Sequence, residues 1–514
     1  MFSDGQLFHL NDSITGFEEA PVGSGNSINF KGRLWAGGII SNSLVGAVQF
    51  TPGPLDTLTG LPDTTNNFYD KVWRINRSMI DYFQLVYASN PQLIPDDIMY
   101  WPAHGGGNYT QQLAPFVDLN NNGIYEPLFG EYPELTGDEM VYWIFNDHGL
   151  DSMSCQPLNI EIHGTAYAYV CDNVDPNSND DAINNTVFYK YTFYKRGLDT
   201  ITDFYVGWWQ NPNLGNGSDD YIGCDTMRNA AFIYNGDNND SLGYGLNPPM
   251  QSYVQLDGPI APSNDGVDNN HNSFIDEPNE KVLFSGFMTY ENNFSIIGTP
   301  ENCQHIFNYL RIRIKDNVPF VNNGTNGYGS GIPTRYLYSG IPYSGQPWTE
   351  ETAGNSPSNR YFLMSCGGTN LYPNQPITYE YAIIFSHYAD APNGANTSFA
   401  LNNAYVDKIT DWYNAQSFPS CYDPTPVAEI QADNSKLIVY PNPATNQLNI
   451  LMDFDIDAVV EVYNLQGQCV AKQQILAGSQ NPEINISNFN NGIYLIRVNT
   501  PTQILLNERL LIAK

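Results

Sequence analysis

Short runs in which large apolar residues alternate with polar ones recur along most of the chain. Clear examples lie at 140–145, 158–170, 187–194, 204–209 and 377–385. A period of two residues places the apolar side chains on one face of an extended strand, so each run predicts a half-buried strand of an antiparallel sheet. We therefore expect residues 1–420 to form a mainly β body, a large antiparallel β-sandwich with one or two subdomains.

Two stretches of the body follow a helical period instead. Apolar residues recur at intervals of three and four over 69–87 and again over 398–415. This spacing predicts one helix in each stretch, with its apolar face in the core. The remaining apolar runs of the body predict further strands at 34–38, 44–50, 283–288 and 310–314.

The charge of the chain excludes several classes of function. Lys and Arg total 21 against 54 Asp and Glu, which gives a formal net charge of −33. A polyanion cannot neutralise phosphates over a broad surface, so nucleic acid and anionic membranes are excluded as main partners. No run of about 18 apolar residues is present, so we expect no membrane span. The chain opens without a basic or apolar targeting segment, and we expect its start to be trimmed or truncated.

The seven cysteines are scattered and contain no C-x-x-C pair. This spacing argues against zinc sites and thiol-redox motifs. Pairing cannot be deduced from sequence, although Cys155 with Cys171 is the local option in an oxidising environment. An odd count leaves at least one thiol free.

The sharpest chemical signal lies at 118–126, where oxygen-bearing side chains alternate before Gly123. Alternation turns short oxygen ligands inward and the glycine permits a sharp bend, as in the first half of a calcium loop. The twelfth position is Phe129 instead of a bidentate Glu, so another acid must close the site. The expected ligands are Asp118, Asn120, Asn122 and the Ile124 carbonyl, closed by Glu126, Glu131 or Asp138.

A second loop, 264–277, repeats this pattern with Ser273 in place of the glycine. Ser and Asn can still turn tightly, so calcium is expected here as well. The expected ligands are Asp268, Asn270, Asn272, the Phe274 carbonyl and Asp276, completed by Asp265 and Glu277. The alternative for the first loop is an Asn-rich turn whose polar groups bond to water.

No common catalytic signature accompanies these loops. The chain has no H-E-x-x-H, G-x-S-x-G, P-loop or G-x-G-x-x-G motif, and His104, beside three glycines, is its most suggestive histidine. A glycosidase needs only two carboxylates about 5–10 Å apart, so the acids at 219, 220 and 225 keep that alternative open. Aromatic residues on the outer faces of the sheets, such as those at 189, 191 and 208, could stack on sugars, although packing between strands is the simpler interpretation.

The end of the chain differs in character from the body. Residues 421–436 are Pro-rich and non-periodic, which predicts a linker. About six short strands follow within 437–514, which favours a small immunoglobulin-like sandwich. Its characteristic runs are Val439-Tyr-Pro-Asn-Pro-Ala444, Val462-Tyr-Asn-Leu-Gln-Gly-Gln468, Ile486-Ser-Asn-Phe489 and Asn491-Gly-Ile-Tyr-Leu-Ile-Arg-Val498, with Lys514 at the end.

These runs closely resemble the type A C-terminal sorting domain of the Bacteroidota type IX secretion system. The resemblance implies contact with the secretion machinery, export to the cell surface or extracellular space, and usually removal of the domain, with release or attachment to a surface glycolipid. Short motifs in the body, such as Trp101-Pro-Ala103 and Tyr234-Asn-Gly-Asp237, resemble those of a family of exported Bacteroidota surface proteins without assigned activity. Several Asp-Ser and Asp-Thr triplets also resemble the O-glycosylation acceptor of that phylum.

Taken together, these features predict an exported structural or adhesive surface protein, stabilised by calcium, that self-assembles or forms filaments. A second copy of the chain and a surface glycan are its candidate partners. A secreted polysaccharide-acting hydrolase and a carbohydrate-binding protein are the alternatives. The absence of catalytic motifs favours a protein that is not an enzyme.

Overall fold

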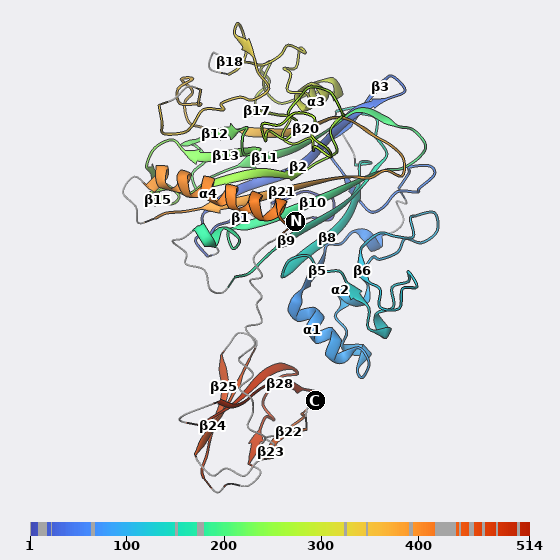
Figure 1. Ribbon diagram of the computed structural model, residues 1–514, viewed down its shortest axis with the longest axis vertical. Coiled ribbons are helices and arrows are strands. Elements are labelled where there is room, and N and C mark those ends of the chain that lie inside the picture. The colour runs from blue at the N-terminus through green and yellow to red at the C-terminus, as the bar shows by residue number, and fades with distance from the viewer. Residues whose placement is uncertain are drawn as a thin grey trace. The chain divides into compact units, whose positions relative to one another are not determined.

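The computed structural model shows two compact units, Met1–Cys421 and Tyr422–Lys514 (Figure 1). The residues that it describes are 2–8, 18–21, 23–62, 67–149, 153–171, 179–322, 326–345, 348–389, 394–416, 438–441, 444–451, 457–464, 468–477, 479, 482–500 and 504–513. The predicted linker, 421–436, lies outside the described residues.

The first large sheet of the body is antiparallel, with the strand order β1-β2-β11-β20-β17 and β3 paired to β2. Its strands are β1 Glu18–Glu19, β2 Ser27–Ile40, β3 Ser43–Ala47, β11 Ile201–Pro212, β17 Gly286–Tyr290 and β20 Tyr361–Leu371. The strands predicted at 34–38 and 204–209 therefore lie within β2 and β11.

The second large sheet is also antiparallel, with the order β12-β13-β16-β21-β10-β9-β8-β4 and β5 paired to β8. Its strands are β4 Thr51–Pro52, β5 Trp73–Asn76, β8 Glu139–Asn146, β9 Ile160–Ala168, β10 Thr186–Lys195, β12 Asp220–Asp225, β13 Ala230–Asn235, β16 Met250–Asp257 and β21 Ile377–Ser386. Four of its strands are the alternating runs that the sequence predicted, namely β8, β9, β10 and β21.

The two sheets pack face to face around one apolar core, so the predicted β-sandwich is confirmed. Trp208 of the first sheet stacks on Tyr381 of the second, with ring centroids 4.6 Å apart. Tyr189 and Tyr191 belong to the same core. The suggestion that Tyr189, Tyr191 and Trp208 lie on outer faces is therefore wrong, because each points from its strand toward the opposite sheet.

The described residues also contain helices and short hairpins. The α-helices are α1 Arg77–Val86, α2 Asp96–Met99, α3 Cys303–Leu310 and α4 Gly394–Asn414, and the 3-10 turns are η1 Asn67–Tyr69, η2 Pro91–Leu93, η3 Pro127–Phe129 and η4 Asn179–Ala182. The two-stranded hairpins pair β6 Phe116–Val117 with β7 Tyr132–Pro133, β14 Asn239–Asp240 with β15 Gly245–Leu246, and β18 Val321–Asn322 with β19 Ile332–Pro333.

The structure corrects two of the predicted elements. Only the second half of 69–87 is helical, because β5 pairs with β8 and the Asn76 side chain then accepts a hydrogen bond from the backbone of Met79, which starts α1. The strand predicted at 310–314 is instead the end of α3 and a following turn. Helix α3 begins at the Asn302 cap and buries Ile306 and Leu310 in the sandwich core.

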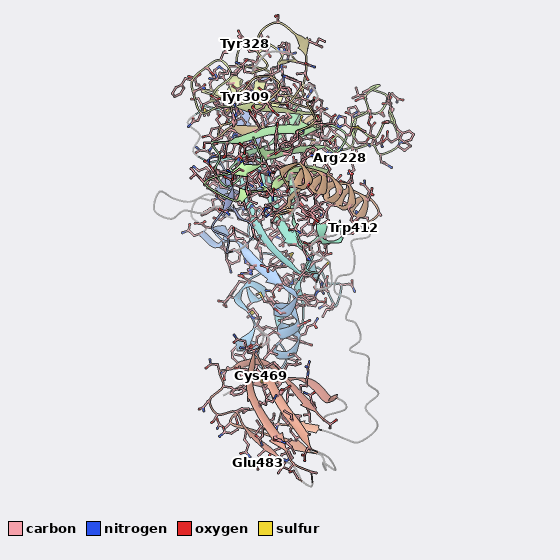
Figure 2. All side chains as sticks on the ribbon, turned by 90° about the vertical axis from the view of Figure 1, so that its left-hand side faces the viewer. Arg228, Tyr309, Tyr328, Trp412, Cys469 and Glu483 are labelled. Carbon is pink, nitrogen blue, oxygen red and sulfur yellow. A yellow bond between two sulfur atoms is a disulfide. The ribbon has the colours of Figure 1, made fainter. Side chains whose placement is uncertain are left out.

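The helix predicted at 398–415 is confirmed as α4, which contacts β16 and β21 on the outer face of the second sheet (Figure 1). Asn402, fully buried, donates to the Ile384 carbonyl at 3.0 Å. Arg228, which Figure 2 shows beside this helix, pairs with Asp407 at 2.7 Å. The helix thus covers one part of the outer face of the second sheet, and the segments around β5–β7 pack on another part.

One disulfide joins Cys155 to Cys303, so the local pairing of Cys155 with Cys171 is wrong. Cys171 is also disulfide-bonded. Three other cysteines are free, Cys224 and Cys366 in the interior and Cys469 at the surface.

The C-terminal unit contains two antiparallel sheets, β22-β23-β26 and β25-β24-β27-β28, around one apolar core. Its strands are β22 Ile438–Tyr440, β23 Gln447–Leu451, β24 Ala458–Tyr463, β25 Cys469–Ile475, β26 Glu483–Asn485, β27 Gly492–Asn499 and β28 Ile504–Ile512. Strand β25 is not among the predicted strands, because its exposed polar residues show little apolar alternation.

Candidate functional site

The first predicted calcium loop connects β6 to β7 and is folded by its own side chains. The Asp118 carboxylate accepts the backbone N–H of Gly123 at 2.7 Å. Asn120 Oδ1 accepts the N–H of Asn122 at 3.0 Å, and Asn122 Oδ1 accepts the N–H of Ile124 at 2.7 Å. These short-range bonds turn three oxygen-bearing side chains toward the inside of the loop.

Two glutamates approach this loop. Glu126 Oε2 accepts the amide groups of Asn120 at 3.0 Å and Asn122 at 2.8 Å. Glu131 is 1% exposed, and its Oε2 accepts the N–H of Glu126 at 2.8 Å. Asp138 instead pairs with Arg77 at 3.2 Å. Of the three acids proposed to close the loop, the structure therefore brings Glu126 and Glu131 to it.

The second predicted loop, before the strands β17 and β20, repeats this bonding. The Asp268 carboxylate accepts the N–H of Ser273 at 2.8 Å, and Asn272 Oδ1 accepts the N–H of Phe274 at 2.8 Å. Glu277 Oε1 accepts the amides of Asn270 and Asn272, both at 2.7 Å. Each bond has its counterpart in the first loop, so the two segments fold as the same motif.

The backbone of the two loops also matches. Gly123 has a φ of 72° and Ser273 a φ of 73°, so the serine adopts the left-handed conformation that a glycine takes more easily. The substitution noted in the sequence therefore leaves the turn intact.

The ends of the second loop are held by two further acids. Asp276 Oδ1 accepts the N–H of Asp265 at 2.9 Å. Glu280, 4% exposed, accepts the N–H of Asn269 at 2.5 Å and corresponds to Glu131 of the first loop. Glu280 is not among the predicted ligands, although it follows Asn272 at nearly the spacing at which Glu131 follows Asn122.

One acid of each loop has a lowered pKa. The hydrogen bond from Gly123 lowers the pKa of Asp118, and the hydrogen bond from Asn270 lowers the pKa of Glu277. Among the described residues, no group of three or more His, Cys, Asp or Glu side chains is arranged to hold a metal. A cation in either loop would therefore depend on amide and backbone oxygens beside one or two carboxylates.

A pocket of about 560 Å³ lies beside the first loop, with Asp118 and Gly123 in its wall. Its floor is the outer face of the second sheet. In that face Tyr142, Thr165 and Lys190 stand directly opposite one another on β8, β9 and β10. Residues 110 and 112–116 form another wall. The second loop borders a separate pocket of about 640 Å³, to which Asn270 and Asn272 contribute.

A buried charge network supports one end of the first pocket. Glu161, with no exposed surface, accepts Arg196 Nη2 at 2.5 Å and His163 Nε2 at 2.8 Å. It also accepts the N–H of Leu55 at 2.8 Å. Burial raises the pKa of Glu161, but the hydrogen bond and charge of His163 and the charge of Arg196 outweigh that effect and hold the pKa at about 2.

This network sets the tautomer of His163, which lines the pocket. Because the Glu161 carboxylate can only accept, Nε2 of His163 carries a proton. Nδ1 is an acceptor in the neutral ring and a donor in the charged ring. The ring also packs against Tyr194, with centroids 4.6 Å apart. The sequence offered no signal for this constellation, since Glu161 and His163 lie on β9 but Arg196 follows β10.

Two of the other residues considered for catalysis, His104 and Asp225, have structural partners. His104 Nε2 accepts the N–H of Tyr125 at 2.8 Å and so ties the first loop to its neighbouring turn. Asp220 and Asp225 stand at the two ends of β12, about 16 Å apart at the rise of an extended strand, which exceeds the spacing of a glycosidase pair. Asp225 pairs with Arg228 at 2.8 Å.

No curated protein matches the chain. Among solved structures, a polysaccharide lyase matches with 9% identity and a TM-score of 0.19, and the match covers 74% of this chain. The chain spans 37% of that structure's length. A TM-score this low does not establish a common fold.

No helix within the described ranges is long and apolar enough to cross a membrane. Residues 438–513 match the family described as the secretion system C-terminal sorting domain, and these residues form the small β unit described above. The resemblance found in the sequence is therefore confirmed. The chain carries a type A sorting domain of the type IX secretion system, which directs it to the cell surface or the extracellular space.

Proposed function

We propose that the body is a structural or adhesive surface protein in which loops 118–131 and 264–280 each hold a calcium ion. The observation that carries this proposal is the repetition of one hydrogen-bonding pattern in two loops far apart in the sequence. Alternating Asp and Asn oxygens, a left-handed residue and a backbone carbonyl at the next position are the features of a calcium loop.

The ligands follow from the geometry. In the first loop, Asp118, Asn120, Asn122 and the Ile124 carbonyl would bind the ion, with Glu126 as the closing carboxylate. In the second loop, Asp268, Asn270, Asn272 and the Phe274 carbonyl would bind it, with Glu277 in the closing role. An amide oxygen has two lone pairs, so an Asn that accepts a backbone N–H can still bind a cation.

The net charge gives such ions a physical role. A chain of net charge −33 repels itself, and a divalent cation in each loop reduces that repulsion while fixing a long turn. Extracellular calcium is millimolar, which suits sites with dissociation constants of about 0.1–1 mM. At a concentration tenfold above its dissociation constant, each ion would add about 1.4 kcal/mol to the free energy of unfolding.

The test is calorimetric titration of the full chain with calcium, together with thermal melting in calcium and in chelator. We expect two sites and a melting temperature that falls on chelation. Asp118→Asn and Asp268→Asn should each abolish one site.

Asp316→Asn is the matched control, because this exposed aspartate accepts a single backbone N–H, that of Val318 at 3.2 Å, in a turn outside both loops. It should leave both sites intact. Absence of binding heat, with identical melting curves in calcium and chelator, would refute the calcium proposal.

A further inference from the structure

We propose that the pocket on the outer face of β8, β9 and β10 binds a saccharide that carries a carboxylate group. The inference gives the adhesive role of the proposed function a ligand class, and it rests on that role but not on calcium binding. The pocket volume of about 560 Å³ falls within the range of about 300–1,000 Å³ typical of small-ligand sites.

The lining of the pocket suits the hydroxyl groups of a sugar. Thr165 and Thr192 are half-buried on its floor, beside the half-buried ring of Tyr194. The Tyr142 hydroxyl is buried and has no hydrogen-bond partner in the described part of the chain. An unmet buried hydroxyl costs free energy, and a ligand oxygen that reached it would remove that cost.

The aromatic and apolar parts of the lining face this polar floor. Leu113, Pro115 and Phe116 form the opposite wall. A sugar ring has polar edges and less polar faces, so a pocket with hydroxyls on one side and apolar groups on the other matches both parts.

Lys190 supplies the preference for a negative group. Its side chain is exposed on the pocket floor, and no carboxylate of the described residues forms an ion pair with it. Glu380, opposite Lys190 on β21, accepts the hydroxyls of Tyr167 and, at 3.0 Å, Tyr413. Burial raises the pKa of Glu380, and the charge of Lys190 opposes that effect. Because Glu380 is already bonded to two hydroxyls and forms no ion pair with Lys190, the ammonium group can still pair with a ligand carboxylate.

His163 adds a ring nitrogen to the lining at the same place. Glu161 holds its Nε2–H, so Nδ1 is the nitrogen left for a ligand group: it accepts from a hydroxyl when the ring is neutral and donates to an oxygen when the ring is charged. Arg196 is occupied by Glu161 at 2.5 Å, so it supports the site without meeting the ligand. The hydroxyls, the ring nitrogen and the cation of the pocket together complement the hydroxyls and the carboxylate of a uronic acid unit.

The experiment is titration of the full chain, in millimolar calcium, with a panel of uronate oligosaccharides: oligogalacturonate, oligoglucuronate and oligomannuronate. The methyl ester of any that binds serves as its neutral counterpart. We expect at least one free acid to bind, and its methyl ester to bind at least about tenfold more weakly, since a charge-assisted hydrogen bond is lost.

Three variants locate the site. Lys190→Met keeps the aliphatic stem and should weaken binding about tenfold or more, and Thr165→Val should weaken it several-fold. Lys31→Met, on β2 of the other sheet, is the matched control and should bind like the parent chain. Melting curves establish that each variant is folded.

Two kinds of result would overturn the inference. One is the failure of every acid in the panel to bind, and the other is binding that methyl esterification or Lys190→Met leaves unchanged. Calcium titration of the same preparations without saccharide separates this failure from that of the proposed function, because it measures the loops alone.

Discussion

Replacement of Glu161 by Gln should destabilise the body strongly at neutral pH and much less in acid. The side chain is fully buried and is bonded to Arg196, itself 7% exposed, at 2.5 Å. Glutamine keeps the shape but removes the charge, so the guanidinium stays buried without a counter-ion. Breaking a buried pair in this way costs about 3–5 kcal/mol.

The dependence on pH follows from the pKa of Glu161, which falls from 4.5 to about 2 on folding. The unfolded chain therefore binds this proton more readily than the folded chain. The stabilisation is fully present above about pH 4.5 and is lost as the pH falls through about 2. At about 1.4 kcal/mol per pKa unit, the amount lost is about 3 kcal/mol.

Urea denaturation of parent and Glu161→Gln chains at several pH values measures this effect. Comparison of the two chains removes the contribution of the other acidic groups, which titrate in both. We expect a gap in unfolding free energy of about 3–5 kcal/mol at about pH 6 that narrows to about 1 kcal/mol near pH 2.

Glu139→Gln is the matched control, since Glu139 pairs with Arg74 while its side chain is 44% exposed. Its effect should stay below about 1 kcal/mol at every pH. A difference in unfolding free energy between the parent and Glu161→Gln chains that is equally large at about pH 6 and about pH 2.5 would refute the assignment of a lowered pKa to Glu161.

Three further outcomes are expected. Gly164→Ala should destabilise the body by about 1–3 kcal/mol in urea denaturation, because a Cβ at this position would lie 2.3 Å from the Trp143 ring; an unchanged midpoint would contradict this packing. Cys155→Ser with Cys303→Ser should lower the unfolding free energy by about 2–5 kcal/mol, since the disulfide closes a separation of 148 residues, and equal stability of the two chains would argue against the bond. In a native host, intact mass should show a mature chain without residues 438–513, the matched sorting domain, whereas a mature mass that includes them would show that the domain is retained.

The sequence alone determined those features that depend on neighbouring residues. Alternation over 187–194 predicts β10, and the helical period over 398–415 predicts α4, because each pattern reports which face of a single element is buried. The oxygens of Asp118 and Asn120 bond to backbone groups within five residues, so the loop could be recognised from its spacing. The sorting domain was recognised in the same way, from its ordered turns and strands.

Tertiary structure decided what depends on residues far apart. Residues 73–76 form a strand because they pair with β8, which lies more than 60 residues further along the chain. A local hydrophobic period cannot predict such a distant partner. The partner of Cys155 and the pairing of Glu161 with Arg196 likewise depend on how the sheets close. The pocket follows the same rule: Tyr142, Thr165 and Lys190 are ordinary polar positions on three strands, and only the register of the sheet places them opposite one another.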